Sequence, residues 1–361
     1  MCAGTAILDE SVAIVHTNHT NTYKLMKVAV LSPIAWRTSP TKYGPWEQIA
    51  SNIAEGLVEK GIDVTLFATG NSSTKGKLEF ISETAYAENS TIEPKVWECL
   101  HISNLMERAD QFDLIHNNYD FLPLSYSQLI KTPILTTIHG FSSPKIIPVY
   151  KKYNKNNFYV SISNSDRSSE LDYIATVYNG IKSSDFTFNS NPKEYLLFFG
   201  RIHPEKGTSE SIQIAKNAGK KLIISGLIQD HDYFNKKVKP FIDNDAVVYV
   251  GNSNPKERNK LLGEAFALLH PISFNEPFGL SVAESMLCGT PVIAFNRGSM
   301  PELIQAGKSG FLVNTIDEAV LAVDSIKWVS RAYCKDWASS KFTQEKMTEG
   351  YLDVYRKILE K

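Results

Sequence analysis

Two cations stand close together in the segment from Gly200 to Gly207, GRIHPEKG. Arg201 and Lys206 lie between an apolar run and a stretch with helical spacing. A guanidinium can bind two oxygens of a phosphate, an ammonium adds a point charge, and the free N–H groups at a helix start complete an anion site. The segment therefore predicts a phosphate-binding site, with a solvated surface turn as the alternative.

A second constellation holds two glutamates, Glu276 and Glu284, with seven residues between them. Gly279 lies in the interval and lets the backbone approach a ligand closely. Ser281 and Glu284 also fit the S-x-x-E pattern, in which the serine is the N-cap of a helix and the glutamate its capping-box partner. Glu276 has no such local explanation, and we expect its carboxylate to bind hydroxyl groups near the phosphate site.

Two further candidates lie in the N-terminal half. The loop over residues 43–48, YGPWEQ, precedes a helical stretch, so its N–H groups around Gly44 could close over a phosphate. The alternative is an ordinary turn with an acidic residue in the first turn of the helix. His139 ends an apolar run and is followed by Gly140. A lone histidine is more often structural, so His139 becomes a site candidate only together with the other groups.

The elements that must position these residues alternate along the chain. Short apolar runs rich in β-branched and aromatic residues start at residues 28, 64, 113, 134, 158, 195, 221, 246, 266 and 291. Helical spacing separates many of them, for example over residues 47–60, where Gly61 stands at the position of a C-terminal cap. This alternation predicts two doubly wound α/β domains with parallel strands, whose ligands bind at the carboxyl ends of the strands.

Composition narrows the class of protein further. The chain has 361 residues, which is enough for two domains. Its formal net charge is −1, so it lacks the excess of basic residues that a nucleic-acid-binding protein needs. No apolar run is long enough to span a bilayer. Four cysteines without a CxxC pair indicate neither a disulfide scaffold nor a zinc site, so we expect a cytoplasmic protein.

Residues 1–25 lack packing periodicity and a basic signal region, and we expect a disordered extension before a natural start at Met26.

Taken together, these motifs resemble the retaining GT-B glycosyltransferases of family four over residues 27–360. FGRIHPEKG matches the G-R-x4-K-G phosphate motif of that family, and EPFGLSVAESMLCGTPVIAF matches its E-x7-E block. The segments YGPWEQIASNIAEGLVEKGIDVTLFATG, DLIHNN, TTIHG and VYNGI resemble its N-terminal landmarks more loosely. The resemblance implies a GT-B fold, in which two Rossmann-like domains face each other across a cleft.

The resemblance also implies a role for each matching residue. Arg201 and Lys206 would bind the donor diphosphate, Glu276 would hold hydroxyls of the donor sugar, and His139 would lie beside the transferred sugar. These four would carry the catalytic step. Glu284 would bind the ribose hydroxyls. The remaining donor contacts would come from the backbone at Gly44, Val250, Asn252, Phe278, Gly279 and Leu280.

The same likeness suggests domain boundaries. Residues 26–186 would form the acceptor-side domain and residues 187–342 the nucleotide-sugar-binding domain, joined by a polar stretch that ends near residue 194. Residues 343–361 would form a helix that crosses back onto the first domain.

Two details bear on the phosphates and on metals. The family usually has two glycines where this chain has Gly44 and Pro45, and Pro45 removes one N–H donor from the loop. Asp230-His231-Asp232 reads as D-x-D, a metal signature of another glycosyltransferase fold, but here it follows an apolar run and precedes a helical stretch, so we interpret it as a polar helix start. With two cations for the diphosphate, we expect no metal and no cofactor.

The resulting hypothesis is a retaining, metal-independent transfer of a hexose from a nucleotide sugar to an acceptor hydroxyl. UDP-glucose is the favoured donor and GDP-mannose, for a mannosyltransferase, the second. The acceptor would be a small molecule, a glycan or a lipid, and the protein a monomer or homodimer. A non-catalytic sugar-nucleotide-binding protein of the same fold is the main alternative. A phosphorylase or a sugar-nucleotide epimerase is less favoured, and a dehydrogenase least, because the chain has no G-x-G-x-x-G.

Overall fold

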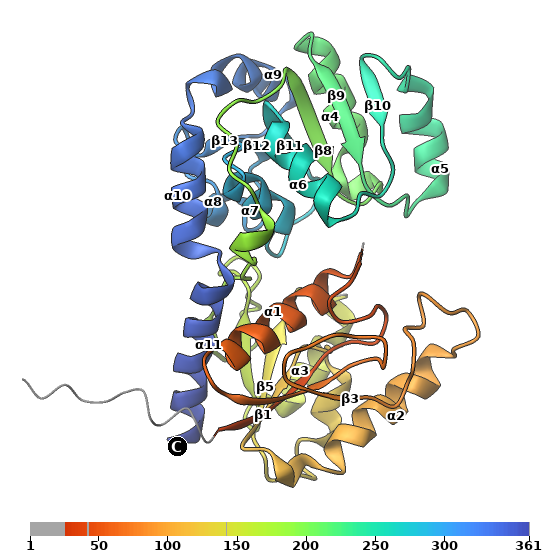
Figure 1. Cartoon of the computed structure of the whole chain (residues 1–361), viewed down its shortest axis with the longest axis vertical. Coiled ribbons are helices and arrows are strands. Elements are labelled where there is room, and N and C mark those ends of the chain that lie inside the picture. The colour runs from red at the N-terminus through yellow and green to blue at the C-terminus, as the bar shows by residue number, and fades with distance from the viewer. Residues whose placement is uncertain (1–25, 42, 142, 361) are drawn as a thin grey trace, which may run out of the picture.

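Two parallel sheets, one in each half of the chain, form two domains stacked end to end (Figure 1). The computed structural model describes residues 26–41, 43–141 and 143–360, so the expected extension over residues 1–25 lies outside it. The N-terminal sheet has the order β3-β2-β1-β4-β5-β6-β7. Its strands are β1 (Lys27–Leu31), β2 (Asp63–Phe67), β3 (Lys77–Glu79), β4 (Leu114–Asn117), β5 (Ile134–Ile138), β6 (Phe158–Ser161) and β7 (Tyr173–Thr176).

The C-terminal sheet has the order β10-β9-β8-β11-β12-β13. Its strands are β8 (Tyr195–Phe199), β9 (Lys221–Ser225), β10 (Val247–Tyr249), β11 (Ala267–His270), β12 (Val292–Phe295) and β13 (Gly310–Val313). Each of the ten apolar runs overlaps a strand, and the expected fold of two doubly wound domains is confirmed. The strands that no run predicted, β3 (KLE), β7 (YIAT) and β13 (GFLV), all lie at sheet edges, and only β3 has a polar sequence.

The helices connect the strands and cover the sheets. They are α1 (Pro45–Glu59), α2 (Pro94–Met106), α3 (Ile147–Tyr153), α4 (Thr208–Asn217), α5 (His231–Tyr233), α6 (Pro255–Glu264), α7 (Leu280–Leu287), α8 (Met300–Leu303), α9 (Ile316–Ser325), α10 (Arg331–Lys341) and α11 (Gln344–Leu359). Helix α1 begins earlier than predicted, with Pro45 in its first turn, where a backbone N–H has no helical partner in any case. Gly61 follows its end with φ +84°, as expected of a C-terminal cap.

The last helix, α11, leaves the C-terminal domain and runs along the N-terminal one beside α1 (Figure 1). Two of its tyrosines bind polar groups in the N-terminal sheet. The hydroxyl of Tyr355 lies 2.6 Å from Nδ1 of His116, and the hydroxyl of Tyr351 lies 2.8 Å from Oγ1 of Thr137. Because His116 and Thr137 are buried on β4 and β5, these bonds tie the end of the chain to the centre of the N-terminal sheet.

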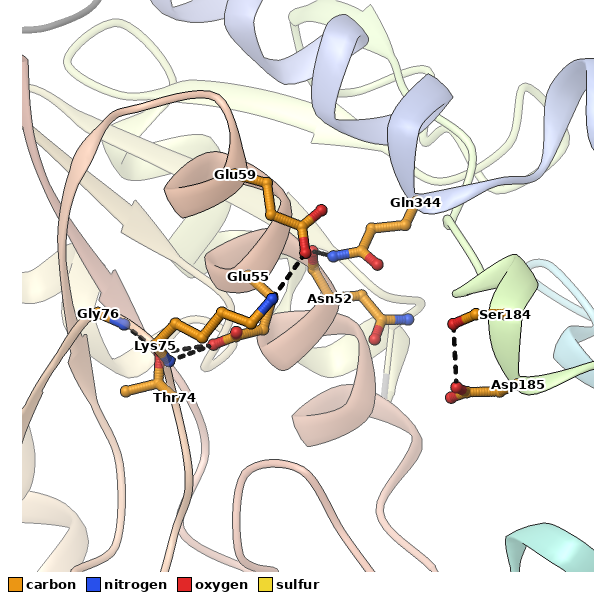
Figure 2. A network of polar contacts seen from close by, with 9 residues as sticks. All are labelled: Asn52, Glu55, Glu59, Thr74, Lys75, Gly76, Ser184, Asp185 and Gln344. Atoms are coloured by element: carbon orange, nitrogen blue, oxygen red, sulfur yellow. Dashed lines mark hydrogen bonds and ion pairs between the residues drawn. The ribbon is translucent and has the colours of Figure 1, made fainter.

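The first turn of α11 is joined to α1 by hydrogen bonds (Figure 2). Nε2 of Gln344 donates to the carbonyl of Asn52 at 2.9 Å, and Nδ2 of Asn52 donates to the carbonyl of Gly180 at 2.8 Å. On the other side of α1, Oε1 of Glu55 accepts from Thr74 at 2.7 Å. Helix α1 is therefore bonded through its middle to the segment between the domains, to the last helix and to the loop between β2 and β3.

A substitution at Gly56 tests this packing. A methyl group there would overlap Oγ1 of Thr348, which α11 places against α1. We expect Gly56→Ala to lower the free energy of unfolding by about 1–3 kcal/mol, as overpacking does. Adding Thr348→Ala should restore most of the loss because it removes the overlapping atom. Thermal unfolding of the single and double variants measures the effect, and a double variant less stable than Gly56→Ala would contradict the packing described.

Candidate functional site

The phosphate segment packs tightly on the loop that follows β11. After β8 the chain forms a turn over Pro204–Lys206, and Gly207 then adopts φ +76°. A Cβ at Gly207 would overlap the carbonyl of Pro271, so only glycine allows this approach. The N–H of Ser273 donates to the carbonyl of Glu205 at 2.9 Å. These contacts fix Lys206 against the loop that carries Glu276.

Lys206 and Glu276 form an ion pair at the centre of the site. Only 14% of the Lys206 side chain and 12% of the Glu276 side chain are exposed. Burial raises the pKa of Glu276, but Lys206 and His270 more than offset this and bring it to about 2. His270, at the end of β11, has Nε2 3.6 Å from Oε2 of Glu276 and was not predicted from the sequence. The site thus holds an ionised carboxylate and an ammonium side by side.

The backbone around Glu276 is held by the turn that precedes α8. The N–H of Ser299 donates to the carbonyl of Glu276 at 2.9 Å, and Oγ of Ser299 donates to the carbonyl of Phe278 at 2.6 Å. A Cβ at Gly298 would overlap the backbone of Glu276, so the two loops are in direct contact. Glu276 is therefore positioned from both sides, by the Lys206 turn and by the α8 turn.

Helix α7 begins beside this pair, and its start differs from the capping-box interpretation. Gly279, with φ +94°, is the N-cap, and no side chain among the described residues caps the helix. Ser281 is inside the helix and is not its N-cap, because the left-handed turn at Gly279 starts the helix earlier. The N–H groups of Leu280 and Ser281 donate to no group among the described residues and are therefore available to an anionic ligand, whereas those of Val282 and Ala283 donate to the carbonyl of Gly279.

Glu284 pairs with a residue that the sequence did not single out. Nη1 of Arg258, on α6, lies 3.1 Å from Oε1 of Glu284, and the guanidinium stacks over the ring of Phe186 at 5.1 Å. Burial, together with the charge of Asp185, raises the pKa of Glu284, and Arg258 opposes this. A cavity of only ≈ 20 Å³, lined by Glu284, Arg258 and residues of α1, lies beside the pair. In this state the domains leave too little room there for a nucleoside.

Three other donor-binding candidates of the C-terminal domain are Arg201, Val250 and Asn252. Arg201 is partly exposed and its guanidinium bonds Oε1 of Gln229. Val250 and Asn252 follow β10, and Val250 is 46% exposed at one end of a groove of ≈ 620 Å³ along β8, β9 and α6. Asp230 is the N-cap of α5, accepting from the N–H of Tyr233 at 2.9 Å, which agrees with the helix-start interpretation. No group of His, Cys, Asp and Glu among the described residues could hold a metal ion.

The N-terminal domain brings its candidates to the opposite wall of the cleft. The ring of Trp46 stacks on His139 at 5.8 Å, and Nε2 of His139 lies 3.0 Å from Oδ1 of Asn118. Burial lowers the pKa of His139 to about 3, so its imidazole is neutral. A Cβ at Gly140 would lie 2.7 Å from Cγ of Pro277, beside Glu276. The two walls therefore meet at Gly140 and Pro277, the residues that follow His139 and Glu276.

Gly44 lies where the first loop enters α1, with φ +140°. A Cβ there would lie 3.0 Å from Cβ of Trp36 and 3.1 Å from Oε2 of Glu47. Oε1 of Glu47 accepts from the N–H of Trp36 at 3.1 Å. Tyr43, the residue before Gly44, is close enough to Arg201 for that charge to lower its pKa, which burial raises more strongly. The loop thus faces the cations across the cleft.

The matches to known proteins point the same way. Residues 180–340 match the family model of the glycosyl transferases group 1. A glycosyltransferase of Methanocaldococcus jannaschii is 23% identical over 92% of this chain and 94% of its own. The Anabaena protein HepE, solved in complex with UDP-glucose, superposes with a TM-score of 0.69 at 18% identity over 92% of this chain and all of its own. The C-terminal domain belongs to the group 1 glycosyltransferases.

Another relative matches less than half of the chain. A 41.2 kDa protein from the cps region of Klebsiella pneumoniae is 35% identical over 169 residues, which is 45% of this chain and 46% of that protein. The family model likewise covers Arg201, Lys206, Glu276 and Glu284 but not His139. The glycosyltransferase therefore carries its family's features most clearly in the C-terminal domain. No helix among the described residues is long and apolar enough to cross a membrane.

Asp166 is a cleft residue of this glycosyltransferase that the sequence did not reveal. It lies in the loop after β6, and its Oδ2 is buried with no hydrogen-bond partner among the described residues. Burial, and to a lesser degree the charge of Glu276, raises the pKa of Asp166 to about 7. Burial and a nearby carboxylate disfavour the ionised form of Asp166 and lower the free energy of unfolding. Such perturbed groups are common at functional sites. No local motif marks Asp166, because its environment comes from the other domain.

This position gives a stability prediction for Asp166→Asn. A carboxyl whose folded-state pKa is raised keeps its proton in the folded state at low pH. The stability that goes with this bound proton is lost as the pH rises through about 7, where the folded protein must release it. The amide never ionises. We therefore expect the variant to unfold at a higher temperature than the parent at pH 8. The difference between the two unfolding temperatures should be smaller at pH 5.5. A lower unfolding temperature for the variant at pH 8, or a gap independent of pH, would contradict this environment.

Proposed function

We propose that this glycosyltransferase moves glucose from UDP-glucose to an acceptor hydroxyl, with retention at the anomeric carbon and without a metal ion. The observation that carries the proposal is the buried pair of Lys206 and Glu276 beside the uncapped start of α7. A cation and free N–H groups suit a diphosphate, and an adjacent ionised carboxylate suits sugar hydroxyls. Arg201 faces the same cleft and supplies a second cation.

In this proposal the leaving diphosphate departs toward Lys206, Arg201 and the start of α7. Preorganised cations stabilise the charge that develops on a leaving group without the help of a metal. Glu276 orients the sugar through its hydroxyls, and the neutral imidazole of His139 lines the opposite wall beside the sugar. In the front-face course proposed for such enzymes, an oxygen of the departing diphosphate takes the proton of the incoming hydroxyl.

The nucleoside would lie between Glu284 and the backbone after β10. The small cavity beside Glu284 means that the domains must open before a donor enters. Closure over the bound donor then excludes water and limits wasteful hydrolysis. The acceptor, which we propose to be a small molecule, a glycan or a lipid, would approach from the N-terminal domain. We further propose a cytoplasmic protein, acting as a monomer or homodimer.

The choice of UDP-glucose rests on the family likeness and on the UDP-glucose complex of HepE. GDP-mannose is the alternative donor. Calorimetric titration with UDP-glucose, UDP-galactose, UDP-N-acetylglucosamine, GDP-mannose and ADP-glucose, each with and without EDTA, tests the assignment. We expect UDP-glucose to bind most tightly and EDTA to have no effect. Preferential binding of GDP-mannose would favour a mannosyltransferase, and absence of binding by every donor would contradict a nucleotide-sugar site.

A non-catalytic sugar-nucleotide-binding protein is the second candidate. Pro45 is the observation that favours it, since a proline in the first turn of α1 cannot donate an N–H to a phosphate. Tight donor binding without release of nucleoside diphosphate, in the presence of varied acceptor sugars, would support this alternative. A lysine-bound pyridoxal phosphate, which a phosphorylase would need, would be visible in the absorption spectrum.

A further inference from the structure

Glu302, on α8 of the C-terminal domain, makes its hydrogen bonds across the cleft. Its Oε2 accepts from the backbone N–H and from Nδ2 of Asn164, at 2.9 and 3.0 Å. Its Oε1 accepts from the N–H of Ser165 at 2.8 Å. Asn164 and Ser165 belong to the loop that follows β6 in the N-terminal domain. One carboxylate of the donor domain therefore binds two consecutive amides of the opposite domain.

A third partner of Glu302 comes from the segment that connects the two sheets. The hydroxyl of Tyr178 donates to Oε2 of Glu302 at 3.0 Å. The ring of Tyr178 also packs near Phe278, with centroids 6.3 Å apart, and against Phe342 at 5.5 Å. Burial raises the pKa of Glu302, but the amides and the hydroxyl outweigh it, so the net shift is downward and the group is ionised at neutral pH. All three partners donate to one carboxylate.

The turn that leads into Glu302 is the same turn that braces Glu276. The N–H of Glu302 donates to the carbonyl of Ser299 at 2.9 Å, and the N–H of Ser299 donates to the carbonyl of Glu276 at 2.9 Å. On the other side of the cleft, the loop bound by Glu302 continues directly into Asp166, which faces Glu276. A short chain of bonds thus connects the interdomain contact with the centre of the site.

We propose that Glu302 is a positioning residue, whose carboxylate closes the two domains by binding the Asn164–Ser165 loop and thereby sets Glu276 against the opposite wall of the cleft. Its partners at this contact are neutral groups, so the bonds can be exchanged for water each time the domains open. Because the nucleoside region is nearly filled in this closed state, the contact must break and re-form in each cycle. For its catalytic consequence, the inference rests on the proposed function.

Hydrogen exchange tests the contact itself without any substrate. In Glu302→Ala, the amides of Asn164 and Ser165 lose their acceptor, and we expect the peptide spanning residues 161–168 to exchange about tenfold faster or more, as the loss of bonds to a charged group implies. Glu302→Gln, which keeps one oxygen acceptor, should lie between the parent and Glu302→Ala. Glu318→Gln is the matched control, because Oε2 of Glu318 accepts from the N–H of Asn314 at 2.7 Å within one domain.

Kinetics separate positioning from simple structural support. Misplacement of one wall of a site lowers the rate more than ground-state binding, so we expect kcat for UDP release to fall about 10- to 100-fold in Glu302→Ala. The dissociation constant for UDP should change little, because within the described part of the chain the bonds of Glu302 go to Asn164, Ser165, Tyr178 and Ser299 and not to the phosphate segment. The control Glu318→Gln should leave both unchanged.

The outcomes are distinguishable. Unchanged exchange of residues 161–168 in Glu302→Ala would overturn the interdomain contact. Faster exchange with unchanged kcat would overturn the positioning role. If the parent protein releases no nucleoside diphosphate from any donor, the proposed function fails, and the exchange experiment still decides whether Glu302 closes the domains.

Discussion

Replacing Lys206 with alanine should reduce kcat/KM for UDP release from UDP-glucose by about 10²- to 10³-fold, the usual effect of removing one preorganised group that stabilises developing charge. Lys206 is mostly buried, bonded to Glu276 and lying over the ring of Phe274 at 4.6 Å. Its ammonium is therefore held in place before a donor arrives. The variant should remain folded, since the turn at Gly207 and the bond from Ser273 to Glu205 do not involve the side chain.

Lys220→Ala provides a closely matched control. Lys220 also pairs with a glutamate, Glu194 at 2.5 Å, and also lies over a phenylalanine ring, Phe266 at 5.0 Å, in the same domain but away from the cleft. We expect its kcat/KM to stay within about twofold of the parent, as for a surface ion pair. Equal losses in the two variants would mean that Lys206 acts through stability and not through the diphosphate.

Glu276→Ala should be about as damaging to turnover, but unlike Lys206→Ala it should not weaken the binding of UDP. Because we propose that Glu276 binds the donor sugar, the variant should bind UDP-glucose more weakly while binding UDP, which lacks the sugar, at least as tightly as the parent. Removal of the carboxylate leaves the Lys206 ammonium without its counter-charge and therefore free for the diphosphate. Lys206→Ala should weaken the binding of both ligands.

Calorimetry with UDP and with UDP-glucose measures this contrast. Glu276→Gln keeps the size of the side chain and removes the charge, so it separates a need for ionisation from a need for volume. If Glu276→Ala lost UDP and UDP-glucose affinity equally, Glu276 would be a structural partner of Lys206 and not a sugar ligand.

The sequence predicted the fold because the fold depends on local patterns, and the roles of the site residues remain predictions. The apolar runs predicted ten of the strands, and the spacing of Arg201 and Lys206 placed them at a strand end. Three edge strands were not predicted: β3 is a short polar segment, KLE, whereas β7 and β13 are apolar segments of only four residues. The capping-box interpretation of Ser281 was wrong because the conformation of Gly279, and not the side chain of Ser281, starts α7.

The partners of the site residues could not be predicted in the same way. Glu284 bonds Arg258 on another helix, and Glu302 bonds Asn164 at a separation of 138 residues. His270 and Asp166 lie beside Glu276 only because two loops and two domains converge there. Each of these contacts depends on tertiary structure, and none follows from a short pattern in the chain.

The most direct test of the central claim is the rate of UDP release from UDP-glucose in the presence of EDTA, compared between the parent protein and Glu276→Ala. Simple sugars serve as trial acceptors, and release into water alone supplies the baseline. We expect the parent to release UDP despite the chelator and Glu276→Ala to release it at least about 100-fold more slowly. Equal rates in the two proteins would contradict a site built on Glu276, and release that EDTA abolishes would contradict catalysis by Arg201 and Lys206 without a metal.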